Sequence, residues 1–285
     1  MGKDTFFYRK NTLTVGGQLR SFDRPMVMGI LNVTPDSFFD GGKHEAEADL
    51  LAQVKKMKAE GADLVDIGGY SSRPGAAEVS VEEETERVLK GVAAVKALWP
   101  EAIISVDTFR AAVARKGVEA GAHIINDISA GQLDDQMFLT VADLQVPYIM
   151  MHMRGTPGTM QSMTDYENLT LEMVHYFESR LKKLRDLGVN DVLIDPGFGF
   201  AKTLEQNYQL LNEMDKLALL QLPILVGVSR KSMIYKLLGG SPAEALNGTT
   251  VLNTLALTKG ANILRVHDVK EAKECAELFA KMLQP

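Results

Sequence analysis

Eight short apolar segments, each ending in or followed by polar residues, constrain the fold more than any other feature of the sequence. Most are continuous runs of Val, Ile, Leu or Met, which is typical of parallel strands covered on both faces. Four of them also have, as their second residue, a glycine that closes a helical pattern. The eight segments are 26–32, 60–69, 102–107, 120–129, 146–152, 187–197, 223–231 and 259–269.

Helical patterns fill most of the gaps between these segments. Ser80 and Glu83 are predicted to form a capping box at the start of one helix. The apolar positions that carry the patterns are Leu50, Leu51, Val54 and Met57; Val88, Val92 and Val95; Tyr208, Leu211, Met214 and Leu217; and Ala272, Ala276 and Phe279. Eight strands alternating with helices over about 250 residues predict an α/β fold of the (β/α)₈ TIM-barrel class. A doubly wound open sheet is the alternative, but no Gly-x-Gly-x-x-Gly follows the first strand.

The 285 residues are expected to form one domain, with an N-terminal β-hairpin over 1–24 and the barrel over 25–285. Gly16 and Gly17 lie between two β-prone runs, which is typical of a hairpin turn. We expect this hairpin to cap the bottom of the barrel. No linker or low-complexity tract divides the chain.

Composition excludes several classes of function. The net charge of −6 without a basic tract argues against a nucleic-acid partner. A single cysteine, Cys275, allows neither an internal disulfide nor a zinc site built on thiolates, and indicates a reducing cytoplasm. The N-terminus lacks the apolar run of a signal peptide. No stretch approaches 18 uncharged apolar residues, so we expect no membrane span.

Polar side chains at the ends of the predicted strands indicate a functional site, because barrel active sites lie at the carboxyl ends of the strands. Any one of them alone could be structural, but together they converge on one mouth. They are Asn32, Asp66, Asp107, Asn126, His152, Asp195, Lys231, Arg265 and His267.

The residue types in this ring suggest the chemistry of a ligand. Arg265 and His267 are two apart on one strand and share a face, so with Asn32 they suit an anionic oxygen group such as phosphate. The group Asp107, Asn126 and Asp195 would suit a guanidine-like edge of a pterin ring. A turn or cap role before Pro196 and Gly197 is the structural alternative for Asp195.

Lys231 follows the seventh strand, where a helix is predicted to start. The hydroxyls of Ser229 and Ser232 and the backbone N–H groups would make an anion site there, whereas a capped helix with a solvated basic first turn is the alternative. Two long loops, 33–44 and 70–80, are candidates for lids or binding loops. Phe38 lies in the first of them, where we expect it to cover a ligand.

Ordered motifs resemble those of the bacterial dihydropteroate synthases, a family of pterin-binding barrel enzymes. The resemblance spans nearly everything from Pro25 to the C-terminus. MGILNVTPDSFFDGG (28–42) is similar to the first family signature and DIGGYSSRPGA (66–76) to the second. The motifs ISVDT, GAHIINDIS, MMHMRGTP, DPGFGF, VGVSRKSM and RVHDV follow in family order. Single motifs would carry little weight, but the ordered set is specific.

The resemblance implies condensation of hydroxymethyl-dihydropterin diphosphate with para-aminobenzoate, which releases pyrophosphate. It implies a catalytic set of Asp107, Asp195, Lys231 and Arg73. It places the pterin against Asp107, Asn126, Ile128, Met151, Asp195, Phe200 and Lys231. It places the diphosphate on Asn32, Arg73, Arg265 and His267. It places para-aminobenzoate near Phe38, Ser72, Pro74, Phe200, Lys231 and Ser232.

The same resemblance implies Mg²⁺ held by Asn32 and diphosphate oxygens, a homodimer formed through outer helices, and sensitivity to sulfonamides. We expect an SN1-like substitution in which the diphosphate leaves first and a closed site protects the resulting cation from water. Two residues depart from the common pattern, Tyr70 for a glutamate and Ser72 for a threonine. Tyr70 leaves the packing of the second loop open.

Three other functions remain alternatives at this level. A folate-dependent methyltransferase would use a similar pterin pocket without needing a diphosphate. A Schiff-base aldolase would use Lys231 and would be trapped by borohydride with a carbonyl substrate. A non-catalytic pterin-binding protein would release no pyrophosphate.

Overall fold

Eight parallel strands close into a barrel in the computed structural model, which describes residues 10–34, 43–71 and 78–283. The ladder runs β8-β7-β6-β5-β4-β3-β10-β9, and a parallel bridge between Ile194 and Ile224 joins its two ends. The strands are β3 (Met26–Asn32), β4 (Leu64–Gly68), β5 (Ile103–Asp107), β6 (Ile124–Asp127), β7 (Tyr148–Met151), β8 (Val192–Asp195), β9 (Leu225–Val226) and β10 (Ile263–Val266). The predicted barrel is confirmed, with one strand in each of the eight predicted segments.

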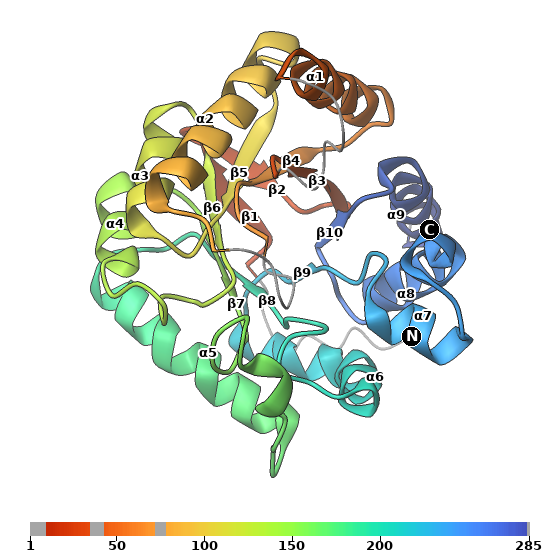
Figure 1. Cartoon of the computed structure of the whole chain (residues 1–285). Helices are drawn as coiled ribbons and strands as arrows, with labels where there is room; N and C mark the ends of the chain where they lie inside the picture. The colour runs from red at the N-terminus through yellow and green to blue at the C-terminus, as the bar shows by residue number, and fades with distance from the viewer. Residues whose placement is uncertain (1–9, 35–42, 72–77, 284–285) are drawn as a thin grey trace.

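A ring of helices surrounds the strands (Figure 1). In the described ranges, one α-helix follows each barrel strand except β9, which is followed by two. The helices are α1 (Lys43–Ala59), α2 (Val81–Leu98), α3 (Ala111–Glu119), α4 (Met137–Leu144), α5 (Leu169–Asp186), α6 (Leu204–Glu213), α7 (Ser232–Leu238), α8 (Leu246–Thr258) and α9 (Val269–Leu283). No helix in the described ranges is both long and apolar enough to cross a membrane.

Two helical predictions need correction in detail. The pattern from Tyr208 to Leu217 does not form one helix, since α6 ends at Glu213 and a 3₁₀ helix, η3, covers Met214–Leu220. Met214, Leu217 and Leu220 are buried at intervals of three residues, and this spacing keeps them on one face of a 3₁₀ helix. At the start of α2, Ser80 accepts a bond from the Glu83 backbone N–H as predicted, while the Glu83 carboxylate pairs with Arg87.

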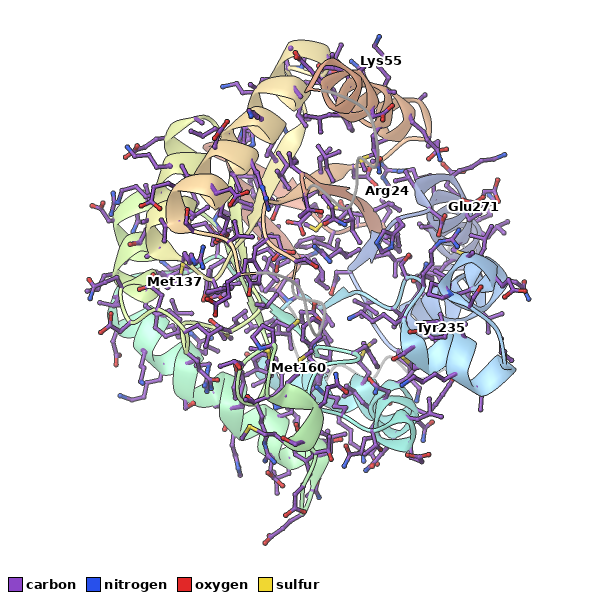
Figure 2. The ribbon with its side chains drawn as sticks, in the orientation of Figure 1. Arg24, Lys55, Met137, Met160, Tyr235 and Glu271 are labelled. Carbon is purple, nitrogen blue, oxygen red and sulfur yellow. The ribbon has the colours of Figure 1, made fainter. Side chains whose placement is uncertain are left out.

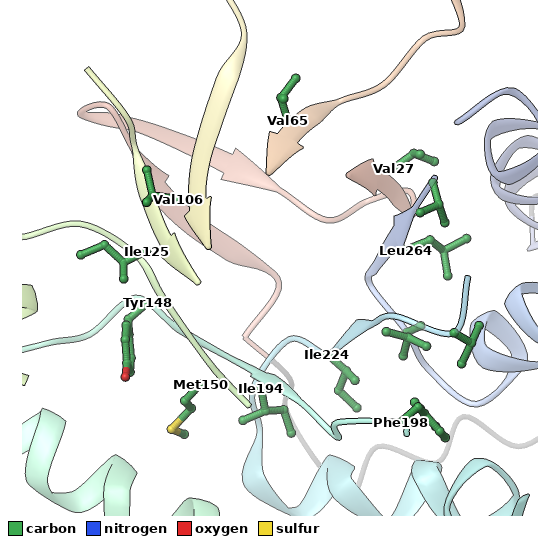
Figure 3. Close-up of a cluster of buried hydrophobic side chains, with 14 of the residues drawn as sticks. Val27, Val65, Val106, Ile125, Tyr148, Met150, Ile194, Phe198, Ile224 and Leu264 are labelled. Atoms are coloured by element: carbon green, nitrogen blue, oxygen red, sulfur yellow. The ribbon is translucent and has the colours of Figure 1, made fainter. Parts of the chain in front are cut away.

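The main core lies between the strands and the helices (Figure 3). Every second residue of a strand points outward into this layer; Val65, Val106 and Ile125 are examples on three neighbouring strands. Close packing of α2 against the barrel depends on Gly91, where an added Cβ would lie 2.6 Å from a side-chain carbon of Ile67. In Figure 2 the side chain of Lys55 projects outward from α1, whereas that of Met160 lies inside the ring of helices.

An N-terminal hairpin closes the amino end of the barrel. Strands β1 (Thr12–Val15) and β2 (Gln18–Ser21) pair across Gly16 and Gly17, whose φ values of +55° and +74° favour glycine in a tight turn. Leu13 and Val15 pack on inward-facing side chains from the barrel strands. We call this buried group the floor cluster: Leu13, Val15, Met28, Leu64, Ile124, Ile149, Leu193, Leu225 and Ile263. The predicted hairpin and its position at the bottom are both confirmed.

Candidate active site

Three predicted site residues, Asn32, Asp107 and Asn126, form a row across neighbouring strands, with Gly68 between the first two. In the sheet register Asn32 lies opposite Gly68, Gly68 opposite Asp107, and Asp107 opposite Asn126. Gly68 leaves space between its neighbours, because an added Cβ would lie 3.4 Å from Oδ1 of Asn32 and 3.8 Å from Oδ2 of Asp107. The parallel strands therefore bring an amide and a carboxylate together at the carboxyl end of the barrel.

Arg265 lies on β10, the strand next to β3, and its side chain reaches two acids of this part of the barrel. Its Nε donates to Oδ2 of Asp66 at 2.6 Å, and its Nη2 donates to Oδ2 of Asp107 at 2.5 Å. Nδ2 of Asn126 donates to the same oxygen of Asp66 at 3.0 Å. Asp66 was expected at a strand end, but it is the third residue of β4 and is fully buried, one level deeper in the barrel.

Burial dominates the electrostatics of Asp107. Desolvation, reinforced by the nearby carboxylates of Asp66 and Glu84, outweighs the attraction of Arg265 and raises the pKa of Asp107 to about 7. One fifth of the side chain remains exposed. Asp107 is thus a carboxylate that can meet a ligand and whose charge changes near neutral pH.

Asp195 and Lys231 form a second charged pair of positions in the mouth. Burial raises the pKa of Asp195 even though the Lys231 ammonium opposes the shift. Oδ1 of Asp195 accepts a bond from the Gly197 N–H at 2.8 Å, so the turn role considered for this residue is also present. Burial lowers the pKa of Lys231 to about 8, against the attraction of Asp195.

The side chain of Lys231 lies over the loop that follows β8. Its Nζ donates to the Phe198 carbonyl and lies 4.7 Å from the ring centroid of Phe200. Lys231 is the N-cap residue of α7, and Ser232 begins that helix. Ser229 does not join them, because its hydroxyl lies 3.1 Å from Nδ1 of His267 and accepts a bond from the His267 N–H. The expected pair of serine hydroxyls is therefore divided between α7 and the end of β10.

An apolar cluster lines the mouth beside the charged groups. It contains Ile128 and Met151, and the half-buried Phe200 packs against it. These are three of the positions that the family resemblance assigns to the pterin. Met153 and Met160 also belong to the cluster and were missed, because single methionines in an irregular loop give no periodic signal.

Lys202 is the main buried group that the sequence analysis missed. Its Nζ lies 3.0 Å from the carbonyls of Gly197 and Phe200 and 3.0 Å from Nδ1 of His152. Desolvation lowers the pKa of Lys202 to about 7. His152, expected in the polar ring, is instead buried behind the loop 196–203 and supports it. The signal in the sequence was a lone lysine directly after the glycine-rich GFGFA.

Tyr70, a departure from the family pattern, is accommodated by an aromatic contact. Its ring meets that of Phe109 edge to face, with centroids 5.3 Å apart, and the Arg110 guanidinium lies 5.5 Å from the Tyr70 ring centroid. Arg110 also pairs with the buried carboxylate of Glu84 at 2.8 Å. The start of the second loop is thus anchored to α2 and to the end of β5.

Four predicted site residues lie outside the described residues: Phe38, Ser72, Arg73 and Pro74. In the described part of the chain, no group of three or more His, Cys, Asp or Glu side chains could hold a metal ion. Asn32 offers a single amide oxygen at the mouth. That fits Mg²⁺, which keeps several waters and substrate oxygens as ligands, better than it fits a metal that needs a protein cage.

A closed barrel with acids, amides and cations gathered at the carboxyl ends of its strands defines a TIM-barrel enzyme. Residues 28–267 match the family model described as "Pterin binding enzyme", and the chain belongs to this family.

Named relatives agree with this assignment. The chain is 44% identical to the dihydropteroate synthase of Escherichia coli K12 over 273 residues, which cover 94% of this chain and 95% of the relative. It is similar to the crystal structure of Yersinia pestis dihydropteroate synthase in a sulfonamide drug complex, with a TM-score of 0.90, 42% identity and coverage of 96% and 100%. It is also similar to Xanthomonas albilineans dihydropteroate synthase with 4-aminobenzoic acid, with a TM-score of 0.89, 39% identity and coverage of 96% and 99%.

Proposed function

We infer that the chain is a transferase with dihydropteroate synthase activity, which condenses hydroxymethyl-dihydropterin diphosphate with para-aminobenzoate. The arrangement of side chains at the mouth of the barrel is the observation that supports this inference. Asp107 and Asn126 lie side by side on adjacent strands, and Arg265 bonds Asp107 within the same cluster. Such a site offers acceptors and donors to a flat heterocycle and a guanidinium to an anion.

The cationic and the acidic side chains of the site would act on different parts of the reaction. The bond between the pterin methylene carbon and the diphosphate oxygen breaks, and both electrons leave with pyrophosphate. Arg265 and His267 would stabilise the departing anion, with Asn32 beside them. Asp107 and Asp195 would face the cation that spreads over the pterin ring. The neutral amine of para-aminobenzoate then forms the new carbon–nitrogen bond and releases a proton.

No protein nucleophile or strong base is needed in this sequence of steps. The chain's contribution is to bind, to orient and to exclude water, since water would capture the cation. Lys231 and Phe200, which lie against each other, would form one side of the slot for para-aminobenzoate. We propose that Phe38, Ser72, Arg73 and Pro74 complete the site from the two loops outside the described residues.

Mg²⁺ is proposed as the cofactor, with Asn32 as the protein ligand. When bound it would neutralise charge on the diphosphate. The Oδ1 of Asn32 and Oδ2 of Asp107 both border Gly68, 3.4 Å and 3.8 Å from where a Cβ on that glycine would lie, so the amide oxygen is at the mouth where the diphosphate would bind.

A pyrophosphate-release assay tests the proposed function. With the pterin diphosphate and para-aminobenzoate together, we expect one pyrophosphate and one dihydropteroate per turnover, and inhibition by a sulfonamide that competes with para-aminobenzoate. Pyrophosphate release that is indifferent to para-aminobenzoate, or no release at all, would contradict the proposal. Sustained turnover after complete chelation of divalent metal would remove Mg²⁺ from it.

We further propose a homodimer that forms through α8 and α9. Each helix exposes a pair of apolar residues four positions apart, Val251 and Leu255 on α8, and Leu278 and Met282 on α9. The two helices pack side by side, so the four side chains are candidates for one contact surface. We also propose a cytoplasmic location, which suits a chain whose only cysteine is a buried free thiol.

A further inference from the structure

Asp66 is fully buried inside the barrel, yet none of the described hydrogen bonds of its side chain goes to a backbone group. Oδ2 accepts from the side chains of Asn126 and Arg265, and within the described ranges Oδ1 has no hydrogen-bond partner. Burying a carboxylate is costly unless it is paired and hydrogen-bonded. The hydrogen bonds that the Asp66 side chain makes therefore indicate its role.

Asp127 shows what a structural carboxylate looks like in the same barrel. It is equally buried, but its oxygens accept from the backbone N–H groups of Ser129 and Gly131 and from the hydroxyl of Tyr148. Those bonds hold the turn after β6. Asp66 holds no turn, because both of its partners are side chains that belong to the candidate active site.

The bond to Asn126 fixes which end of that amide faces the ligand. A carboxylate oxygen facing the guanidinium of Arg265 accepts hydrogen bonds and does not donate them. The amide group nearest to Asp66 must therefore be the Nδ2 donor, and the Oδ1 acceptor points away from Asp66. Without Asp66, the two orientations of the Asn126 amide would differ little in energy, and either could face a bound ring.

We propose that Asp66 is a positioning residue that orients the Asn126 amide, so that Asn126 presents its carbonyl oxygen to an N–H donor on the pterin ring. Arg265 holds the Asp66 carboxylate in place through its Nε. This inference rests on the proposed function, since it concerns the same pterin site. It adds that the ring edge opposite Asn126 carries a hydrogen-bond donor.

A double-mutant cycle tests the proposal on the dissociation constant of 6-hydroxymethyl-7,8-dihydropterin, a ligand without the diphosphate that Arg265 would bind. D66A and N126A should each weaken binding about tenfold, the range expected for losing a hydrogen bond to a charged group or a bond that depends on it. The double variant should also lose about tenfold rather than a hundredfold, because Asp66 acts through Asn126. A hundredfold loss would mean independent effects and would overturn the proposal.

Two further variants separate positioning from a general effect on the fold. D66N can keep an oxygen in place of Oδ2 and should bind the dihydropterin within about threefold of the unmodified protein. A folded D66N protein that binds as weakly as D66A would also overturn the proposal. S105A is the matched control, because Ser105 lies opposite Asp66 in the register and is fully buried, with no partner for its hydroxyl among the described residues. It should leave binding unchanged.

The outcomes also distinguish this inference from the proposed function. If the unmodified protein neither binds the dihydropterin nor releases pyrophosphate, the proposed function fails. If it does both and the cycle is additive, only the role of Asp66 fails.

Discussion

At the scale of single residues, the arrangement around Arg265 decides how charge is used in the site. Asp107 shares the guanidinium with Asp66 and remains partly exposed, so it is the carboxylate of this pair that a ligand can reach. A bound anion would compete with Asp107 for Arg265. We therefore expect Asp107 to matter most when positive charge develops on the ring.

Asp107→Asn should lower kcat about 10²–10³-fold, the range seen when one preorganised electrostatic group is removed from an active site. Binding of the ground-state pterin should weaken much less, because the neutral amide still forms a hydrogen bond. Steady-state kinetics and direct titration of the dihydropterin measure the two effects. Equal losses in kcat and in affinity would argue against a role in the transition state.

The pH dependence of kcat/KM should be bell-shaped, with limits set by Asp107 and Lys231. Desolvation raises the pKa of Asp107 to about 7, so its carboxylate appears, and activity rises, as the pH increases through that value. Desolvation lowers the pKa of Lys231 to about 8, so its ammonium, and activity, are lost as the pH increases further. A full pH–rate profile checks both limits. Lys231→Arg should move the alkaline limit upward, and an unmoved limit would assign it to another group.

The residues of the site were only partly predictable from the sequence. Asn32, Asp107, Asn126 and Arg265 could be found because each lies at or near the carboxyl end of an apolar run. The contacts between them could not, since the pairing of Arg265 with Asp66 joins residues 199 positions apart. Lys202 was missed because it follows a glycine-rich loop and not a strand.

At the scale of elements, the loop 196–203 is the least regular part of the described site and one of the most firmly held. Gly197, Gly199 and Ala201 all have positive φ, and an added Cβ on Gly197 would lie 2.1 Å from the His152 carbonyl oxygen. Ala201 adopts a conformation that costs a residue with a side chain some free energy. Lys202 and the Tyr166 hydroxyl, which donates to the Ala201 carbonyl, hold the loop in this form.

Lys202→Met should loosen this loop and so raise the KM for para-aminobenzoate about tenfold, because Phe200 loses the bond that fixes its carbonyl. The KM for the pterin diphosphate should change less, since Asp107 and Asn126 lie on other strands. Steady-state kinetics with each substrate varied in turn makes the comparison. Lys182→Met, at an exposed lysine of α5, is the control and should behave as the unmodified protein. Equal changes in both KM values would point to general damage.

The elements themselves followed closely from apolar periodicity, with η3 as the instructive exception. The spacing of three residues between Tyr208, Leu211, Met214 and Leu217 predicted a continuous α-helix. The chain tightens at Met214 into η3, in which Met214, Leu217 and Leu220 are three residues apart, lie on one face and are buried. The spacing of apolar residues alone could not distinguish an α-helix from a 3₁₀ helix over this segment.

At the scale of the whole molecule, apolar side chains exposed on α8 and α9 bear on assembly. Leu255→Glu together with Leu278→Glu should convert a dimer into a monomer, because two buried charges would face each other across a symmetric contact. Sedimentation equilibrium at micromolar concentration measures the change. Leu139→Glu on α4, on the other side of the helical ring (Figure 1), should leave the mass unchanged. An unmodified protein that is already monomeric would refute the proposed dimer.

The hairpin packs on the floor cluster and so blocks passage through the amino end of the barrel. In the described part of the chain this leaves the carboxyl end of the barrel for entry, so dihydropteroate, which contains both the pterin and the aminobenzoate groups, should leave by the route through which the pterin diphosphate entered. Dihydropteroate that is still bound then prevents the next pterin diphosphate from binding. Initial-rate measurements should accordingly find dihydropteroate to be a competitive inhibitor against the pterin diphosphate, whereas a purely noncompetitive pattern would imply a separate exit.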